Sequence, residues 1–137
     1  MSKKKLKPSP NAKMHPKVAS AKTVFSNNGY AKEDLSFDDF YTLSQQPCYY
    51  CNAKPLQTKN RFLEPSYTIK YGVNDYNLIN CTFIYNGLDR IDSNKPHSKE
   101  NCVPCCKVCN YAKLTMSVAE FKTWVISIYN NFIKKSK

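Results

Sequence analysis

Two Cys-x-x-Cys pairs constrain the fold of this chain more than any other feature. Cys48 and Cys51 form the first pair, Cys106 and Cys109 form the second, and 54 residues lie between the two pairs. Four thiolates suit a tetrahedral Zn²⁺ ion, which can stabilise a domain whose hydrophobic core is small. A complete shell of four thiolates leaves no position for water. The pairs therefore predict one structural zinc ion that joins two distant segments.

The register of the second pair is ambiguous, because Cys102 and Cys105 also form a Cys-x-x-Cys. We prefer the later pair because the residues that follow it, Asn110 and Lys113, match the pattern of a known protein family that this part of the chain resembles, but the earlier pair remains an alternative. In the preferred register Cys81, Cys102 and Cys105 are spare, and we expect them to be small buried side chains. A redox role is less favoured, since no thioredoxin-like βαβ pattern surrounds either pair.

The basic charge of the chain is concentrated at its ends. The net charge is +11, and residues 1–26 hold seven Lys and no acidic residue. Three more Lys follow residue 133, which leaves eleven basic and ten acidic side chains between residues 27 and 133. Basic tails favour polyanions because each phosphate contact releases counterions, so nucleic acid is the first partner to expect. The alternative is a solvated tail that only keeps the protein in solution.

The N-terminus and the length of the chain indicate an intracellular protein with one domain. A Lys run followed by Pro and Ser is unlike a signal peptide, and no apolar run approaches the roughly 20 residues that span a bilayer. We therefore expect reduced thiols and an intracellular location. The 137 residues suit a single small domain.

Local patterns predict an α+β organisation. Residues 1–26 show no period and are expected to form a flexible basic arm, with the domain over 27–137. The sequence SFDDF predicts a capped helix from Ser36 that ends before Pro47. Residues 54–80 are expected to be rich in loops, with one short strand near 67–71.

The second half of the chain predicts a hairpin followed by two helices. Residues 81–85 favour a strand, the Asn-Gly at 86–87 favours a turn, and 88–92 and 101–105 are expected to pair around a loop at 93–100. Helix is expected from Asn110, with a break near Thr115 and a new helix over 118–133. An apolar stripe in that helix is expected to pack on the core. It comprises Val118, Phe121, Trp124, Val125, Ile128 and Phe132.

Residues 87–113, GLDRIDSNKPHSKENCVPCCKVCNYAK, resemble the ββα-metal finger of HNH endonucleases. Asp89 matches the first metal-binding acid of that family, Asn101 matches the Asn that ties the finger together, and Asn110 matches the final metal-binding Asn. The likeness covers about residues 36–125 and is specific only over 86–113. It implies a zinc-stapled finger over 81–116, similar to the HNH proteins of phages and mobile elements, with Mg²⁺ or Mn²⁺ held by Asp89 and Asn110.

One residue departs from the family pattern, since Arg90 stands where HNH nucleases have a catalytic histidine. A guanidinium stays protonated and cannot accept a proton from water. Three alternatives follow. Asp92 or His97 acts as the base; or Arg90 holds the scissile phosphate while a hydroxide on the metal attacks; or the protein binds nucleic acid without cutting it.

The resemblance implies a metal-dependent endonuclease that hydrolyses DNA phosphodiester bonds, with double-stranded DNA as the partner. We expect basic side chains to contact its phosphates, namely Lys3, Lys4, Lys5, Lys7, Lys95, Lys107 and Lys113. The first alternative function is a degenerate HNH finger that only binds nucleic acid. The second is a zinc-stapled structural protein that uses its lysine tails.

Overall fold

The computed structural model describes residues 16–136, which form an α+β fold with two small antiparallel sheets. The first sheet pairs β1 (Gln57–Lys59) with β2 (Phe83–Tyr85), and the second pairs β3 (Gly87–Arg90) with β4 (Cys102–Cys105). Six α-helices accompany them among the described residues. They are α1 (Pro16–Asn27), α2 (Phe37–Ser44), α3 (Pro65–Tyr71), α4 (Asp75–Asn80), α5 (Lys107–Lys113) and α6 (Val118–Ile128). The predicted α+β class is confirmed.

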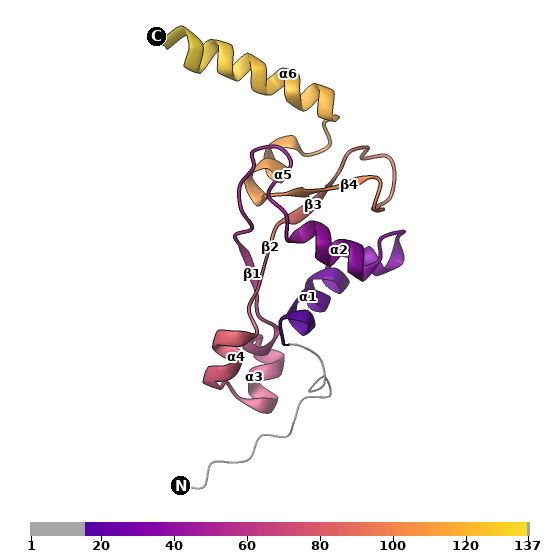
Figure 1. The fold of residues 1–137 in the computed structure, drawn as a ribbon, viewed down its shortest axis with the longest axis vertical. Helices are drawn as coiled ribbons and strands as arrows, with labels where there is room; N and C mark the ends of the chain where they lie inside the picture. Colours follow the sequence, from indigo (N-terminus) through magenta and orange to yellow (C-terminus); the bar gives the residue numbers. More distant parts are fainter. Residues whose placement is uncertain (1–15, 137) are drawn as a thin grey trace, which may run out of the picture.

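The second sheet and α5 form a compact ββα unit (Figure 1). Asp89 pairs with Val103 across the β3–β4 hairpin, and Arg90 pairs with Cys102. Helix α5 begins directly after β4, because Cys106 accepts a hydrogen bond from the Cys109 backbone and caps it. The predicted strand pairing and loop are present in this unit, whereas the helix expected from Asn110 begins earlier, at Lys107.

The expected turn at Asn86-Gly87 is wrong, because the chain runs on from β2 through Asn86 into β3. Asn86 is buried, and its side-chain amide donates to the carbonyl oxygens of Gln46 at 2.9 Å and Ala53 at 3.2 Å. Its backbone N–H donates to the Ser44 carbonyl at 2.8 Å. Asn86 therefore connects the two sheets and holds both ends of the first cysteine loop.

The expected flexible arm is wrong over residues 16–26, which belong to helix α1. Val24 and Phe25 are buried, together with small residues such as Ala21, and they pack with Phe40 of α2. Three of the buried residues of α1 are small, namely Ala19, Ser20 and Ala21, and small residues give a weak sequence signal for a buried helix face. The rest of the expected arm, residues 1–15, lies outside the described residues.

The main core lies where α1, α2 and β2 meet. Helix α2 matches its prediction, since the Ser36 hydroxyl accepts a hydrogen bond from the Asp39 backbone at 3.1 Å. This cap aims Phe40 into a group of aromatic rings that includes Phe25, Tyr30 and Phe83. Leu88 of β3 and Cys102 of β4 belong to the same cluster, so the core supports the second sheet with few but large side chains.

The expectation that residues 54–80 are rich in loops is wrong, because β1, α3 and α4 lie in this range. The strand expected near residues 67–71 is also wrong, because this segment forms helix α3. Pro65 occupies the first turn of the helix and Gly72 follows its end with a φ of 74°, which suits glycine. Asn74 then caps α4. The two helices lie together at the far end of the β1–β2 ribbon, well away from α5 (Figure 1).

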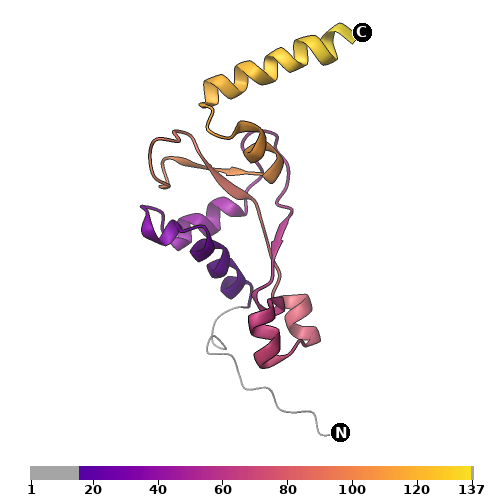
Figure 2. The same ribbon diagram turned by 180° about the vertical axis from the view of Figure 1, so that it is seen from behind.

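Helix α6 begins after the predicted break, but the expected packing of its apolar stripe is wrong. Ser117 and Glu120 form the predicted capping box. Phe121 is buried against Tyr50, with ring centroids 5.2 Å apart. Beyond it, α6 and the helical turns over Tyr129–Ile133 and Lys134–Ser136 lead away from the body, as both views show (Figures 1 and 2). The side chains exposed there include Trp124, Val125, Ile128 and Phe132.

Candidate metal centre and catalytic cavity

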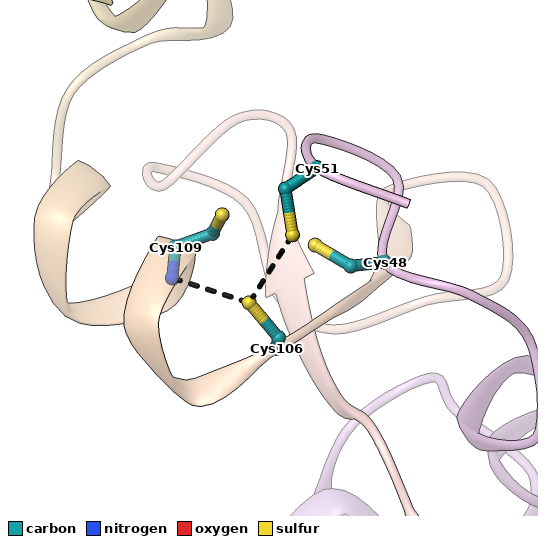
Figure 3. Close-up of side chains that lie close together, drawn as sticks. All are labelled: Cys48, Cys51, Cys106 and Cys109. Atoms are coloured by element: carbon teal, nitrogen blue, oxygen red, sulfur yellow. Dashed lines mark hydrogen bonds between the residues drawn. The ribbon is translucent and has the colours of Figure 1, made fainter. Parts of the chain in front are cut away.

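The four cysteines of the preferred register meet in space (Figure 3). Their sulfur atoms all lie within 4.8 Å of one another, and the sulfurs of Cys51 and Cys106 are 3.6 Å apart. Zinc–sulfur bonds of about 2.3 Å in a tetrahedron separate the sulfurs by roughly 3.8 Å, so the cluster fits zinc. Cys102 and Cys105 are buried in β4 and do not belong to the cluster. The later register is therefore the one that the structure supports.

The local backbone explains how the first pair is presented. Asn52 adopts a left-handed φ of 62°, and its N–H donates to the Cys48 carbonyl at 2.8 Å. Burial alone raises the pKa of the Cys48 thiol, but backbone N–H donors, the first from Cys106 and Cys51, lower it to about 7. Donors of this kind favour the thiolate that a metal ion requires.

Asp89 forms a buried polar cluster with Lys113 and Tyr50. Its Oδ2 atom accepts a hydrogen bond from the Tyr50 hydroxyl at 2.6 Å and lies 3.0 Å from the Lys113 ammonium. Lys113 is 0% exposed and also donates to the Arg90 carbonyl at 3.3 Å. Burial and then the bond to Asp89 raise the pKa of Tyr50. The predicted contact between Lys113 and nucleic acid is therefore wrong, because a fully buried ammonium cannot reach a phosphate.

Four of the predicted catalytic residues line one cavity of about 230 Å³. They are Asp89 and Arg90 of β3, His97 of the following loop and Asn110 of α5. Asn28 and Tyr30 contribute to the wall from the N-terminal part of the chain. The hairpin and α5 thus bring a carboxylate, a guanidinium, an imidazole and an amide to one place.

His97 is oriented by a carboxylate that the sequence did not reveal. Its Nδ1 atom lies 2.5 Å from Oε2 of Glu33, and its ring is 4.7 Å from the ring of Tyr30. A carboxylate on Nδ1 fixes that nitrogen as the donor, which leaves Nε2 to accept a proton. Glu33 is 64 residues from His97, and a bridge between Asp34 and Ser98 joins the two segments. No motif links residues so far apart in the sequence.

Asp92 and Asn101 organise the loop and are not among the residues lining the cavity. Asn101 accepts from the Asp92 backbone at 2.9 Å and donates to the carbonyls of Asp92 and Pro96, each at 3.0 Å. This is the tying role expected for Asn101. The Asp92 carboxylate accepts from the Asn94 backbone at 3.0 Å and thereby caps the turn. Of the two candidate bases, only His97 faces the cavity.

The remaining predicted phosphate contacts divide between exposed and undescribed residues. Lys95 and Lys107 are exposed, and the Lys107 ammonium lies 5.7 Å from the centre of the Tyr111 ring. Lys3, Lys4, Lys5 and Lys7 lie outside the described residues.

The donor atoms at the cavity suit a hard divalent cation only in part. Asp89 and Asn110 offer oxygen atoms of the type that Mg²⁺ prefers. One oxygen of Asp89 is already engaged by Tyr50 and Lys113. An ion would therefore bind through the second carboxylate oxygen and the Asn110 carbonyl, close to a buried ammonium.

Comparisons with known proteins identify one viral relative. An uncharacterized protein of Acanthamoeba polyphaga mimivirus is 29% identical over 98 residues, which cover 72% of this chain and 14% of that protein. This chain thus matches only a small part of its relative. No family model matches the chain, and no solved structure matches it. Within residues 16–136, no helix combines the length and the apolar character that crossing a membrane requires.

Proposed function

We propose that this protein is a metal-dependent endonuclease of the HNH type that hydrolyses DNA phosphodiester bonds, with His97 as its general base. The observation that carries the proposal is an imidazole, oriented by Glu33, at the same cavity as Asp89, Arg90 and Asn110. In this proposal the role that the family gives to the residue after Asp89 has moved to the following loop.

The proposed proton transfer depends on which ring nitrogen of His97 carries a proton. With Nδ1 held by Glu33, Nε2 takes a proton from the attacking water, and the Glu33 carboxylate stabilises the imidazolium that forms. This arrangement removes the difficulty that Arg90 poses, because the base no longer has to be the residue after Asp89.

Arg90 acts on the phosphate in this proposal. Its guanidinium donates to the Lys95 carbonyl at 3.2 Å, which holds the side chain at the cavity wall. A guanidinium matches two phosphate oxygens at once, so Arg90 orients the scissile group. A Mg²⁺ or Mn²⁺ ion on Asp89 and Asn110 would neutralise charge that develops on the phosphate.

One observation favours a second candidate, a finger that binds nucleic acid without cutting it. The Lys113 ammonium lies 3.0 Å from the Asp89 carboxylate and already balances its charge. A divalent cation binds less strongly to a carboxylate whose charge an ammonium already neutralises.

A plasmid-nicking assay separates the two candidates. Supercoiled DNA is incubated with Mg²⁺ or Mn²⁺ and the wild type, His97→Ala, Glu33→Gln or Asn110→Ala, with Lys99→Ala as an exposed control. We expect His97→Ala to slow nicking by roughly 100-fold or more, because a general base contributes about 10²–10⁴-fold. Glu33→Gln should slow nicking less than His97→Ala does, because the imidazole is still present. If every protein shifts the plasmid in a gel and none cuts it, the binding candidate replaces the nuclease.

An Arg90→His variant examines the departure from the family pattern. If His97 is the base, a second imidazole at position 90 should not raise the nicking rate, and the loss of the guanidinium should weaken it. A large gain would mean that Arg90 suppresses catalysis and that His97 is not the base.

A further inference from the structure

The catalytic cavity continues into a groove along α5. It shares Asn28, Tyr30, Leu88 and Asn110 with a second cavity of about 280 Å³. That cavity shares Gln57, Tyr85 and Lys107 with a third, of about 610 Å³, which reaches Lys54. Neighbouring cavities share lining residues, so the three lie next to one another, and together they are here called the α5 groove. It leads from Arg90 past Tyr111 to Lys54.

The chemistry of the outer part of the groove suits an anionic polymer. The charged residues that line its two outer cavities are Lys54 and Lys107, with no Asp or Glu, and the apolar side chains of Leu56 and Val108 line the outermost cavity beside them. The amides of Asn28 and Gln57 supply further hydrogen-bonding groups. Such a lining favours the binding of phosphates, because lysine ammonium groups neutralise their charge and side-chain amides donate hydrogen bonds to their oxygens.

Tyr111 adds an aromatic surface beside this positive charge. Its side chain is 66% exposed on α5, although it lines the groove, and Lys107 lies over its ring. An exposed ring with a neighbouring ammonium can stack an unpaired base while the ammonium contacts a phosphate. A base inside a duplex cannot stack in this way because its faces are covered by its neighbours.

We propose that the α5 groove binds one unpaired DNA strand next to the scissile phosphate, with Tyr111 stacking a base and with Lys107 and Lys54 contacting phosphates. The proposal rests on the proposed function, because it extends the catalytic cavity into a substrate path. It names the substrate as DNA with a single-stranded segment, such as an overhang or an opened duplex, in place of a fully paired duplex.

Binding of fluorescent oligonucleotides tests the groove without requiring cleavage. Anisotropy is measured in Ca²⁺ with single-stranded and duplex DNA of equal length, for the wild type, Tyr111→Ala, Tyr111→Phe, Lys107→Ala and Lys54→Ala. We expect Tyr111→Ala to weaken single-strand binding about 10-fold, because stacking contributes about 1–3 kcal/mol per base. Tyr111→Phe should bind like the wild type. Lys107→Ala should reduce the slope of log K against log salt by about 0.7.

Matched controls exclude effects of folding and general charge. Tyr76→Ala and Lys99→Ala remove an exposed tyrosine and an exposed lysine that do not line the groove, and both should bind normally. Lys107 also neighbours the zinc ligand Cys106, so zinc content is measured for each variant. The proposal is overturned if the groove variants bind like the controls, if the duplex binds better than the single strand, or if Lys107→Ala acts by losing zinc.

The outcomes also separate this proposal from the proposed function. If groove variants weaken binding while no protein nicks DNA, the groove stands and the nuclease fails. If the wild type nicks DNA and the groove variants bind and nick equally well, the nuclease stands and the groove fails.

Discussion

At the scale of single residues, the buried pair of Asp89 and Lys113 is the interaction with the largest consequences. Removing two charges from water costs several kcal/mol per ion, and the hydrogen bonds from Tyr50 to Asp89 and from Lys113 to the Arg90 carbonyl help to offset that cost. The pair joins α5 to β3, and Tyr50 extends the connection to the first cysteine loop. Asp89 therefore has a structural role in addition to any role at the cavity.

Breaking the pair on one side should destabilise the fold strongly. Lys113→Met leaves the Asp89 carboxylate buried without its counter-charge, and we expect the free energy of unfolding to fall by about 3–5 kcal/mol. Urea denaturation followed by circular dichroism measures the change. Lys107→Ala, on the exposed face of the same helix, should change it by less than about 0.5 kcal/mol. A loss below about 1 kcal/mol for Lys113→Met would contradict a buried ion pair between Asp89 and Lys113.

Some residues of the candidate sites could be predicted from the sequence and others could not. The four cysteines of the candidate metal site were predictable, because Cys-x-x-Cys spacing fixes the local geometry of each pair. The carboxylate on His97 was not, because Glu33 reaches it only through the packing of two segments far apart in the chain. The burial of Lys113 was not predictable either, since a lysine in a basic protein is usually exposed.

At the scale of elements, the four-cysteine cluster connects the loop at residues 48–51 to the start of α5. The backbone N–H of Tyr49 donates a hydrogen bond to the Pro104 carbonyl oxygen at 2.8 Å, and this bond supports the junction. Backbone bonds of this kind align the loop with β4, and an ion bound by all four sulfurs would also fix the loop to the start of α5.

Metal removal should therefore unfold the ββα unit. We expect about one zinc per chain by elemental analysis. After chelation the unit should already be unfolded at room temperature, so heating should change the far-ultraviolet circular dichroism signal much less than it does for the metal-bound protein. Cys106→Ser should lose zinc and stability together. Cys102→Ala, in the core near β4, should keep its zinc and lose only about 1–2 kcal/mol. Retention of zinc by Cys106→Ser would instead indicate the earlier register.

Helix α6 shows what periodicity can and cannot predict. Its start, its capping box and its length follow from Ser117, Glu120 and the spacing of apolar residues. The direction in which it leaves the body depends on the turn after α5, where Leu114 has a φ of 48°. An apolar stripe is compatible with any partner, so the sequence could not reveal that the body ends near Phe121.

Substitutions along α6 should separate its buried start from its exposed remainder. Phe121→Ala removes a ring packed against Tyr50, and we expect a loss of about 3–5 kcal/mol. Val125→Ala, at a position that is 45% exposed, should cost less than about 1 kcal/mol in the isolated protein. Thermal denaturation of both variants decides the matter. Equal losses would mean that more of α6 is covered in solution.

At the scale of the whole molecule, the small main core contains two ionisable side chains among its apolar residues. Tyr30 and Cys102 both belong to the main cluster of buried residues. Burial raises the pKa of Cys102 from 9.0 to about 11, and burial likewise raises the pKa of Tyr30 above its ordinary value of 10.0. The folded state therefore keeps protons that the unfolded chain releases.

The protein should lose stability in alkali for this reason. The contribution of Cys102 is fully present below pH 9.0 and is lost as the pH rises towards 11, because only the unfolded thiol ionises in that window. Urea midpoints measured from pH 8 to pH 11 should fall, and Cys102→Ala should make the early part of that fall shallower. A midpoint independent of pH across this window would contradict the burial of these groups.

The four-cysteine cluster closes a long segment of chain at its base, from Cys51 to Cys106, which includes the β1–β2 ribbon and the two helices at its end. For a flexible loop, added length costs only about 0.6 kcal/mol for each doubling. Helices α3 and α4 contain no buried residue, whereas Phe62 before them and Cys81 after them pack with Ala19 of α1. We therefore expect insertions and deletions among relatives to concentrate between residues 68 and 76, and Phe62 and Cys81 to stay buried and apolar.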